Sequence, residues 1–173
     1  MFVLWLRKPL LCTAALLLSA SASAKQEVFG WIEKASMPGI GVTAKVKMDT
    51  GALTSSIHAT DVERFLKDDE KWVRFTVKLE DSNTEEPVTK TLERPFHRKV
   101  KISGAGGVDN RVVVFLDICI GDRLLREQFT LSDREDKKYG MLIGRRTMKH
   151  MGLVDVTQTF TSQPDCSQSL GSL

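Results

Sequence analysis

Apolar and polar residues alternate along much of the chain with a period of two. Every second position is apolar from residue 40 to residue 48, and the same holds from residue 73 to residue 79. This alternation is typical of a β-strand that buries one face. Strands are accordingly predicted over residues 27–34, 40–48, 72–79, 111–120 and 124–131, with a hairpin turn at Gly121-Asp122 between the last two.

Patterns typical of helices are few and short. Residues 60–66 can form one helix, with Thr60 or Asp61 as its N-cap. Residues 145–151 can form another, which would end at Gly152. Residues 81–87 and 158–173 are polar, and we predict a loop for the first and a flexible tail for the second. The expected fold class is all-β, a small closed or sandwiched sheet with one or two short helices.

The first 24 residues have the three regions of a secretory signal peptide. Arg7 and Lys8 provide positive charge, residues 9–18 form an apolar run, and Ala22-Ser23-Ala24 fits a small-residue cleavage site. The apolar run is shorter than the roughly 20 residues that span a bilayer. An uncleaved anchor that includes residues 1–6 is the alternative. We therefore predict cleavage after Ala24, a periplasmic or secreted location, and no stable membrane insertion afterwards.

Charge and cysteine content narrow the function classes. The 173 residues contain 25 Lys and Arg against 22 Asp and Glu, a net charge of +3. Removal of residues 1–24 leaves 149 residues and a net charge of +1, because two basic residues and no acidic ones are lost. No block of five basic residues occurs, which argues against nucleic-acid binding. Cys119 and Cys166 remain, and they can either pair in an oxidising compartment or stay free thiols.

The segment with the clearest chemical content follows the predicted strand 40–48. Asp49 stands there before Thr50, Gly51 and Ala52, so a carboxylate is presented on a tight turn of small residues. A plain turn explains an isolated Asp-Thr-Gly equally well, because all three residues favour turns. Two further features give the motif a context, a Gly-rich turn over residues 102–107 and an apolar segment, 139–145, that ends in Gly-Arg.

These three features, in this order, resemble the retropepsin-like aspartic proteases. The Asp-Thr-Gly-Ala sequence resembles their catalytic motif, and residues 141–145 resemble the segment that packs beside it. The stretch 49–59, Arg94-Pro95, Ser132-Asp133-Arg134 and Val154-Asp155 resemble a bacterial group that is also labelled ATP-dependent zinc protease. The resemblance covers about residues 27–157. It implies a small retropepsin-like barrel, with a peptidase domain over residues 25–157.

The resemblance also implies roles for single residues. Asp49 would be the catalytic carboxylate, and His58 would line the site. The active-site loop would be supported by Thr50, Gly51, Ala52, Ile143, Gly144 and Arg145, and a flap-like turn over the substrate would contain Ser103, Gly104, Gly106 and Gly107. One position departs from the retroviral pattern. Leu53 replaces an acidic residue, so Arg145 lacks the carboxylate partner expected there.

Aspartic proteases need two carboxylates that share one proton, whereas this chain has a single Asp-Thr-Gly. A two-fold homodimer would supply the second as Asp49 of the partner subunit. The resemblance therefore implies an exported aspartic endopeptidase that is active as a homodimer. It would hydrolyse a peptide or protein substrate with an activated water and without a cofactor.

Two alternatives remain open. One is a catalytically silent module of the same fold that binds peptides or a partner protein. The other is a zinc-dependent peptidase, as the family label suggests. His58, His97 and His150 do not have the His-Glu-x-x-His spacing of a zinc site, and no Gly-x-x-x-x-Gly-Lys sequence for ATP occurs. The sequence thus predicts no metal ligands.

Overall fold

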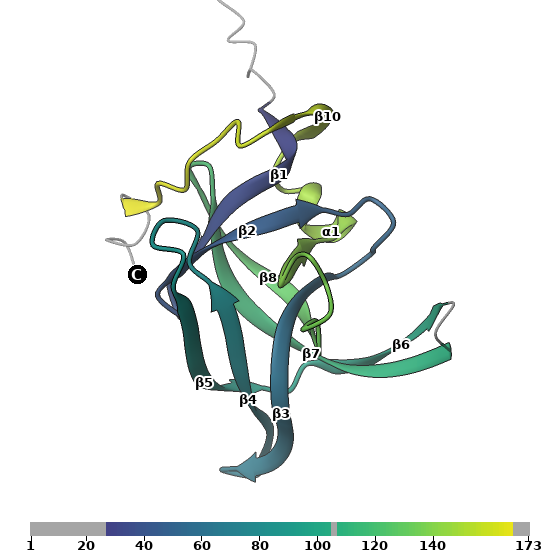
Figure 1. The fold of residues 1–173 in the computed structure, drawn as a ribbon. Coiled ribbons are helices and arrows are strands. Elements are labelled where there is room, and N and C mark those ends of the chain that lie inside the picture. The colour runs from purple at the N-terminus through teal and green to yellow at the C-terminus, as the bar shows by residue number, and fades with distance from the viewer. Residues whose placement is uncertain (1–26, 105–106, 168–173) are drawn as a thin grey trace, which may run out of the picture.

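The computed structural model describes residues 27–104 and 107–167, which are mostly β-strands (Figure 1). The strands are β1 (Val28–Met37), β2 (Val42–Met48), β3 (Ser55–Lys67), β4 (Glu70–Glu80), β5 (Pro87–Pro95), β6 (Arg98–Gly104), β7 (Gly107–Ile120), β8 (Arg123–Ser132), β9 (Met141–Ile143) and β10 (Leu153–Thr159). One short helix, α1 (Arg145–Met148), connects β9 to β10. The predicted all-β class is confirmed.

The strands close into a barrel. Neighbours are hydrogen-bonded in the order β10-β1-β2-β9-β3-β8-β7-β6, and Ser36 of β1 also pairs with Cys119 of β7. That pairing joins the two ends of the series from β1 to β7, so these strands form a ring. β4 pairs with β3 and with β5, which extends the barrel on one side. The predicted small closed sheet is therefore confirmed.

The alternating positions of the sequence form the core. In β2, Val42, Ala44, Val46 and Met48 are buried, whereas Lys45 between them is exposed. Burial of one such large aliphatic side chain stabilises the fold by about 1.5–3 kcal/mol. Because β2 is anchored along its whole length, the residue that follows it is held at a fixed place at the end of a rigid strand.

Residues 60–66 form a strand, so the helix predicted there is wrong. They belong to β3, which pairs with β4 through a register shift near Asp61, where φ is 52°. Asp68 and Asp69 join the two strands with φ angles of 51° and 61°, as in a type I′ hairpin turn. Pairing with β4 outweighs the local helix propensity. The outer half of β3 is largely exposed on both faces, which removes the alternation that marks a strand.

Three other local predictions can be compared with the structure. The hairpin at Gly121-Asp122 is confirmed, since Ile120 pairs directly with Arg123. The helix predicted over 145–151 is shorter, because residues after Met148 continue as a turn. The polar loop after β4 is present and is organised by Asp81. Its carboxylate accepts the N–H groups of Thr43, Asn83 and Thr84, and the bond from Thr43 is the main cause of its lowered pKa.

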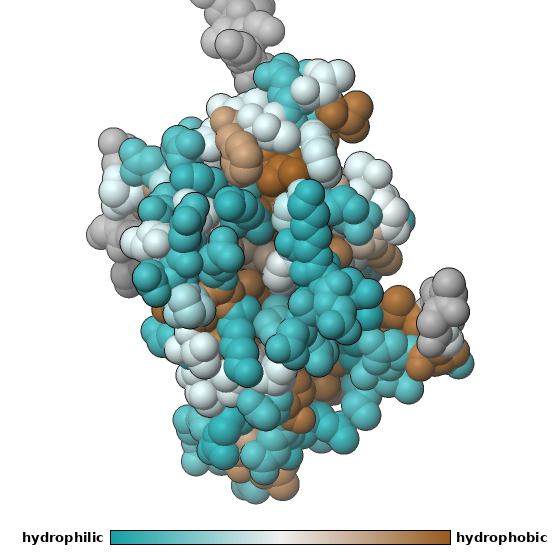
Figure 2. Space-filling view, viewed as in Figure 1, coloured by the Kyte–Doolittle hydropathy of each residue, from teal (hydrophilic) through white to brown (hydrophobic). Residues whose placement is uncertain are grey.

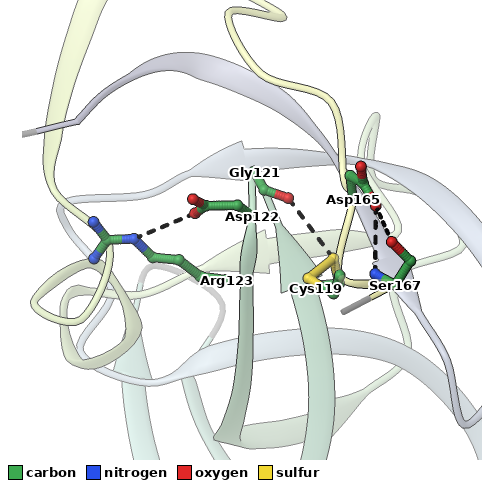
Figure 3. Close-up of a disulfide and its surroundings, with 7 residues drawn as sticks. Cys119, Gly121, Asp122, Arg123, Asp165 and Ser167 are labelled. Carbon is green, nitrogen blue, oxygen red and sulfur yellow. Dashed lines mark hydrogen bonds and ion pairs between the residues drawn. A yellow bond between two sulfur atoms is a disulfide. The ribbon is translucent and has the colours of Figure 1, made fainter. Parts of the chain in front are cut away.

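The C-terminal segment is tied to the barrel and differs from the flexible tail predicted from residue 158. β10 runs parallel to β1, and the buried Glu33 then accepts the backbone N–H groups of Thr161 at 2.9 Å and Ser162 at 3.1 Å. Farther along, Cys166 forms a disulfide with Cys119 of β7 (Figure 3). The sequence left open whether these two cysteines pair or stay free thiols, and in the structure they are paired. Residues 168–173 and the predicted signal peptide lie outside the described residues.

Removal of this disulfide is expected to lower the free energy of unfolding by about 2–4 kcal/mol, because the bridge restricts the unfolded chain across a long loop. The two cysteines are 47 residues apart in sequence. Urea unfolding of the Cys119→Ala/Cys166→Ala variant, compared with the wild type, measures the change. A reductant should move the wild type toward the double variant and leave the double variant unaffected. If the double variant and the reduced wild type both unfold at the same urea concentration as the oxidised wild type, the expectation is wrong.

Hydrophilic residues dominate the face shown in Figure 2. Apolar residues gather at the end of the arm that β6 and β7 extend away from the barrel (Figures 1 and 2), where Ile102 and Val108 are exposed. In the part of the chain that the structure describes, no helix is long and apolar enough to cross a bilayer.

Candidate active site

Asp49 directly follows β2 and lies beside the end of β9. Its N–H donates to the carbonyl oxygen of Ile143 at 2.9 Å, because β2 and β9 run parallel to this point. Its Oδ1 accepts the N–H of Gly51 at 3.0 Å, and the N–H of Ala52 donates to its carbonyl oxygen at 3.1 Å. The half-buried carboxylate is therefore oriented by a tight turn whose position is fixed by the sheet.

The segment after β9 braces this turn. The N–H of Arg145 donates to the carbonyl oxygen of Ala52 at 2.9 Å, and its guanidinium donates to that of Thr50. Arg145 thus holds the backbone of the turn, while Leu53, at the position of the missing acidic partner, is exposed. A Cβ on Gly144 would lie 2.6 Å from the carbonyl carbon of Thr54, so only glycine permits this close approach.

A buried network of polar side chains lies behind Gly144. Its N–H donates to Ser55 Oγ at 3.1 Å, and Ser55 Oγ lies 2.8 Å from Thr147 Oγ1. Thr147 in turn donates to Glu127 at 3.4 Å, and Glu127 contacts His150 Nδ1 at 2.5 Å. These residues position the loop next to Asp49. Sequence reasoning missed Ser55, Glu127 and Thr147, because they belong to different elements and form no motif.

His58 lies on β3, is buried, and contacts the Ser132-Asp133-Arg134 segment. Its Nδ1 accepts the N–H of Arg134 at 2.7 Å and lies 3.5 Å from Asp133 Oδ1. A nitrogen that accepts an N–H carries no proton, so neutral His58 has its proton on Nε2. His58, Arg134 and Tyr139 line a hollow of about 830 Å³. The structure therefore brings together two separate segments that carry the sequence resemblance, the stretch 49–59 and Ser132-Asp133-Arg134.

The charges of Arg134, Arg111 and Asp49 influence one another. Burial and the nearby charge of Arg111 lower the pKa of Arg134, while the negative charge of Asp49 acts in the opposite direction. Coulombic effects of this kind weaken with distance, so these three groups share one electrostatic environment. The Asp49 carboxylate is therefore near enough to the Arg134 guanidinium for their charges to interact.

A cleft of about 440 Å³ opens beside the Asp-Thr-Gly turn. Gly51, Ala52 and Leu53 form one wall, and side chains of β6 form another. Its charged lining residues are all basic, namely Arg98, Lys101, Arg111 and Arg146. The cleft can therefore accept a ligand with negative charge beside the Asp-Thr-Gly turn.

The predicted flap-like residues lie at the tip of the β6–β7 arm. β6 and β7 pair antiparallel up to Gly104 and Gly107, with Ser103 opposite Val108. Gly106 lies outside the described residues. The inner part of this arm, from Arg98 to Ile102, forms a wall of the cleft beside the Asp-Thr-Gly turn, whereas Gly107 at the tip does not line the cleft.

The histidines have separate surroundings. The ring of His97 contacts that of Phe115 at a tilt of 55°, with centroids 4.7 Å apart, while His58 contacts Arg134 and His150 contacts Glu127. Within residues 27–104 and 107–167, no group of three or more His, Cys, Asp or Glu side chains is arranged to hold a metal ion.

Comparison with known proteins gives matches over most of the chain. The RimB-like family model, described as "Retropepsin-like aspartic endopeptidase RimB", matches residues 28–165. Two curated relatives carry the name "Probable alpha-L-glutamate ligase". The Shewanella halifaxensis protein is 31% identical over 134 residues, with 77% of this chain and 29% of the relative covered. The Parasynechococcus marenigrum protein is 30% identical over 148 residues, with 84% and 30% covered.

A solved structure is also similar. The crystal structure of a Legionella pneumophila protein with unknown function matches with a TM-score of 0.66 and 31% sequence identity. The match covers 79% of this chain and 98% of that chain. By contrast, the present chain spans less than a third of the length of the curated relatives described above.

Proposed function

Because this chain belongs to the RimB-like family of retropepsin-like aspartic endopeptidases, we propose that it hydrolyses peptide bonds with a water molecule activated at Asp49. The observation that carries this proposal is the turn at the end of β2. The turn orients a half-buried carboxylate through the Ile143 carbonyl and the Gly51 N–H, next to a cleft that the β6–β7 arm borders.

The chemistry requires a second carboxylate, which a homodimer would supply. Two carboxylates about 3 Å apart cannot both ionise, so they share one proton. The ionised group takes a proton from water as the water oxygen attacks the carbonyl carbon, and the protonated group donates to the carbonyl oxygen. The group that took the proton then donates it to the amide nitrogen as the C–N bond breaks and the amine leaves. The other carboxylate regains its proton from the hydroxyl derived from the carbonyl oxygen, so the pair returns to its starting state. We propose Asp49 of the partner subunit as that second group, because the chain has only one Asp-Thr-Gly.

The proposed location is outside the cytoplasm. The Cys119–Cys166 disulfide supports it, because disulfides persist mainly in oxidising compartments such as the periplasm. The three-part pattern of residues 1–24 supports it independently.

We propose a glutamate-rich peptide as the substrate class. The lining of the cleft beside Asp49 contains four basic side chains and no acidic ones. Two relatives are named for glutamate ligation, and a hydrolase acting on glutamate polymers would break the type of bond that such a ligase forms. A cleft lined by positive charge attracts an acidic peptide more strongly than a neutral peptide of the same shape.

The test is a cleavage assay of residues 25–173 with quenched fluorogenic peptides, one rich in Glu and one with Gln in its place. We expect faster cleavage of the Glu peptide and a bell-shaped rate profile on the acid side, as for two coupled carboxylates. Activity should rise more than linearly with protein concentration where monomer and dimer coexist. Specific activity that stays constant when the protein is monomeric would contradict the shared dyad.

The same assay separates the alternatives. Peptides that bind without any cleavage across the pH range would favour the silent binding module. Loss of cleavage on addition of a chelator, with recovery on addition of zinc, would favour the metallopeptidase. Chelator-insensitive cleavage is the expected result for an aspartic dyad.

A further inference from the structure

Two guanidinium groups converge on one hydroxyl in the cleft beside Asp49. Arg98 Nη2 donates to Thr54 Oγ1 at 3.3 Å, and Arg146 Nη1 donates to the same oxygen at 3.1 Å. Arg98 is also held by Gln128 Oε1, which accepts from its Nε at 3.1 Å and its Nη2 at 2.8 Å. β6, α1 and β8 thus deliver these groups to one place. Both guanidinium groups belong to half-buried residues and are positioned by neutral partners.

The positive charge of this pair is not compensated within the described residues. Of the four basic residues in the cleft, Arg111 pairs with Asp109, whereas Arg98 and Arg146 form no ion pair with a described carboxylate. Burial, and then the charge of Arg146, lowers the pKa of Arg98. Two like charges held close together in a partly desolvated place are unfavourable, and a bound anion would relieve that cost.

A third group in the cleft lacks a partner. Ser56 is 2% exposed, lines the cleft, and its Oγ makes no hydrogen bond within the part of the chain that the structure describes. Buried hydroxyls are seldom left unpaired. Successive side chains of a strand point to opposite faces, so Ser55 joins the network behind Gly144 while Ser56 faces the cleft. A ligand oxygen would satisfy this hydroxyl.

We propose that Arg98, Arg146 and Ser56 form a subsite that binds one carboxylate group of the peptide beside the scissile bond. A carboxylate is planar and has two oxygens, so two fixed guanidinium groups can each donate to it while Ser56 donates a further hydrogen bond. Thr54 and Gln128 position the arginines for this task. The place of the subsite in catalysis rests on the proposed peptidase function, but its affinity for a carboxylate does not.

Binding is therefore measured in the Asp49→Asn background, where the peptide is not consumed. Isothermal titration compares a Glu-containing peptide with its Gln counterpart, each with a free or an amidated C-terminus. The double variant Arg98→Gln/Arg146→Gln should bind the Glu peptide at least tenfold more weakly than the parent protein. This is the expected effect of losing roughly one to two charge-assisted hydrogen bonds to the carboxylate. The Gln peptide with an amidated terminus should bind equally to both proteins. Ser56→Ala should weaken only the carboxylate peptides, by a few-fold.

Two controls keep the result specific. Lys149→Gln removes a charge from the turn after α1, outside the cleft, and should leave the preference for Glu unchanged. Arg98→Lys/Arg146→Lys keeps the charge and removes the planar geometry, so it should retain part of the preference for the Glu peptide. Its melting temperature shows whether the fold tolerates substitution at these two positions. The affinity difference between the parent protein and the double variant also identifies the bound carboxylate. If this difference disappears when the peptide C-terminus is amidated, but not when Glu is replaced by Gln, the subsite binds the C-terminal carboxylate.

Other outcomes overturn the subsite. An undiminished preference for carboxylate peptides in the folded double variant would do so. If the double variant binds charged and neutral peptides more weakly by the same factor, the two arginines do not recognise a carboxylate specifically. A wild-type protein that binds carboxylates through these arginines but cleaves nothing would contradict the peptidase function and leave the subsite intact, so the two failures are distinguishable.

Discussion

Replacement of Asp49 by Asn is expected to lower kcat for peptide hydrolysis by at least about 10³-fold, because general acid–base catalysis by a positioned carboxylate contributes on that order. An amide can neither take a proton from water nor share one with a second carboxylate. The fold should be retained, because the Asn Oδ1 can still accept the N–H of Gly51, which Asp49 Oδ1 accepts at 3.0 Å. Asn is therefore a better test than Ala, which would also loosen the turn.

The measurement is single-turnover cleavage of the best peptide substrate, with melting temperature and peptide affinity determined on the same samples. Asp117→Asn is the matched control, because Asp117 is an exposed residue of β7 and undergoes the same change in charge. Its kcat should remain within about twofold of the wild type, as for surface substitutions away from special features. Full cleavage activity in a purified, folded Asp49→Asn protein would exclude aspartic catalysis.

The barrel could be predicted where a strand has one buried and one exposed face. β2 and β4 satisfy that condition along their length, and their alternation was plain in the sequence. The outer half of β3 does not, because it extends beyond the barrel and its pairing with β4 is set by a tight turn and a register shift. A local pattern of polar residues there was compatible with a helix, and only the partner strand decides against it.

The site could be predicted as far as it is contiguous in the chain. The Asp49 turn and the segment after β9 are short motifs, and each carries its own geometry. Arg98, Thr54 and Ser56 could not be associated with one another, because only the pairing of β6 with β7, β7 with β8 and β8 with β3 places Arg98 near the start of β3. Their polar character alone is ordinary for surface residues. Only their common position around one cleft gives them a shared chemistry.

The C-terminal segment shows the same limit for stability. Its Ser, Gln and Thr content suggested a flexible tail, yet these short polar side chains are the partners of a buried carboxylate. Glu33 Oε1 accepts from the N–H of Gly30 at 2.6 Å and from the hydroxyl of Thr161 at 2.6 Å, and Oε2 accepts from the hydroxyl of Ser162 at 3.1 Å. Composition indicated solvent exposure, whereas the buried carboxylate of Glu33, more than 120 residues earlier in the chain, helps to determine where the segment lies.

Glu33→Gln is expected to lower the free energy of unfolding by about 3–4 kcal/mol, and hence the melting temperature by roughly 10 °C. The variant has nearly the same volume, but its NH₂ group replaces an oxygen that accepts hydrogen bonds. That group would face the N–H of Thr161 or of Ser162, both of which donate to Glu33, and a buried donor would then lack its acceptor.

Thermal and urea unfolding measure the effect, with Glu85→Gln in the exposed loop after β4 as the matched control. The control should change the free energy of unfolding by less than about 0.5 kcal/mol. Glu33 and the disulfide hold the same segment, so we expect Glu33→Gln to cost less in the absence of the Cys119–Cys166 bridge than in its presence. If Glu33→Gln and Glu85→Gln unfold at the same temperature with the bridge intact, the carboxylate does not anchor the segment, and the disulfide and the backbone hydrogen bonds to β1 and Gly121 account for its position.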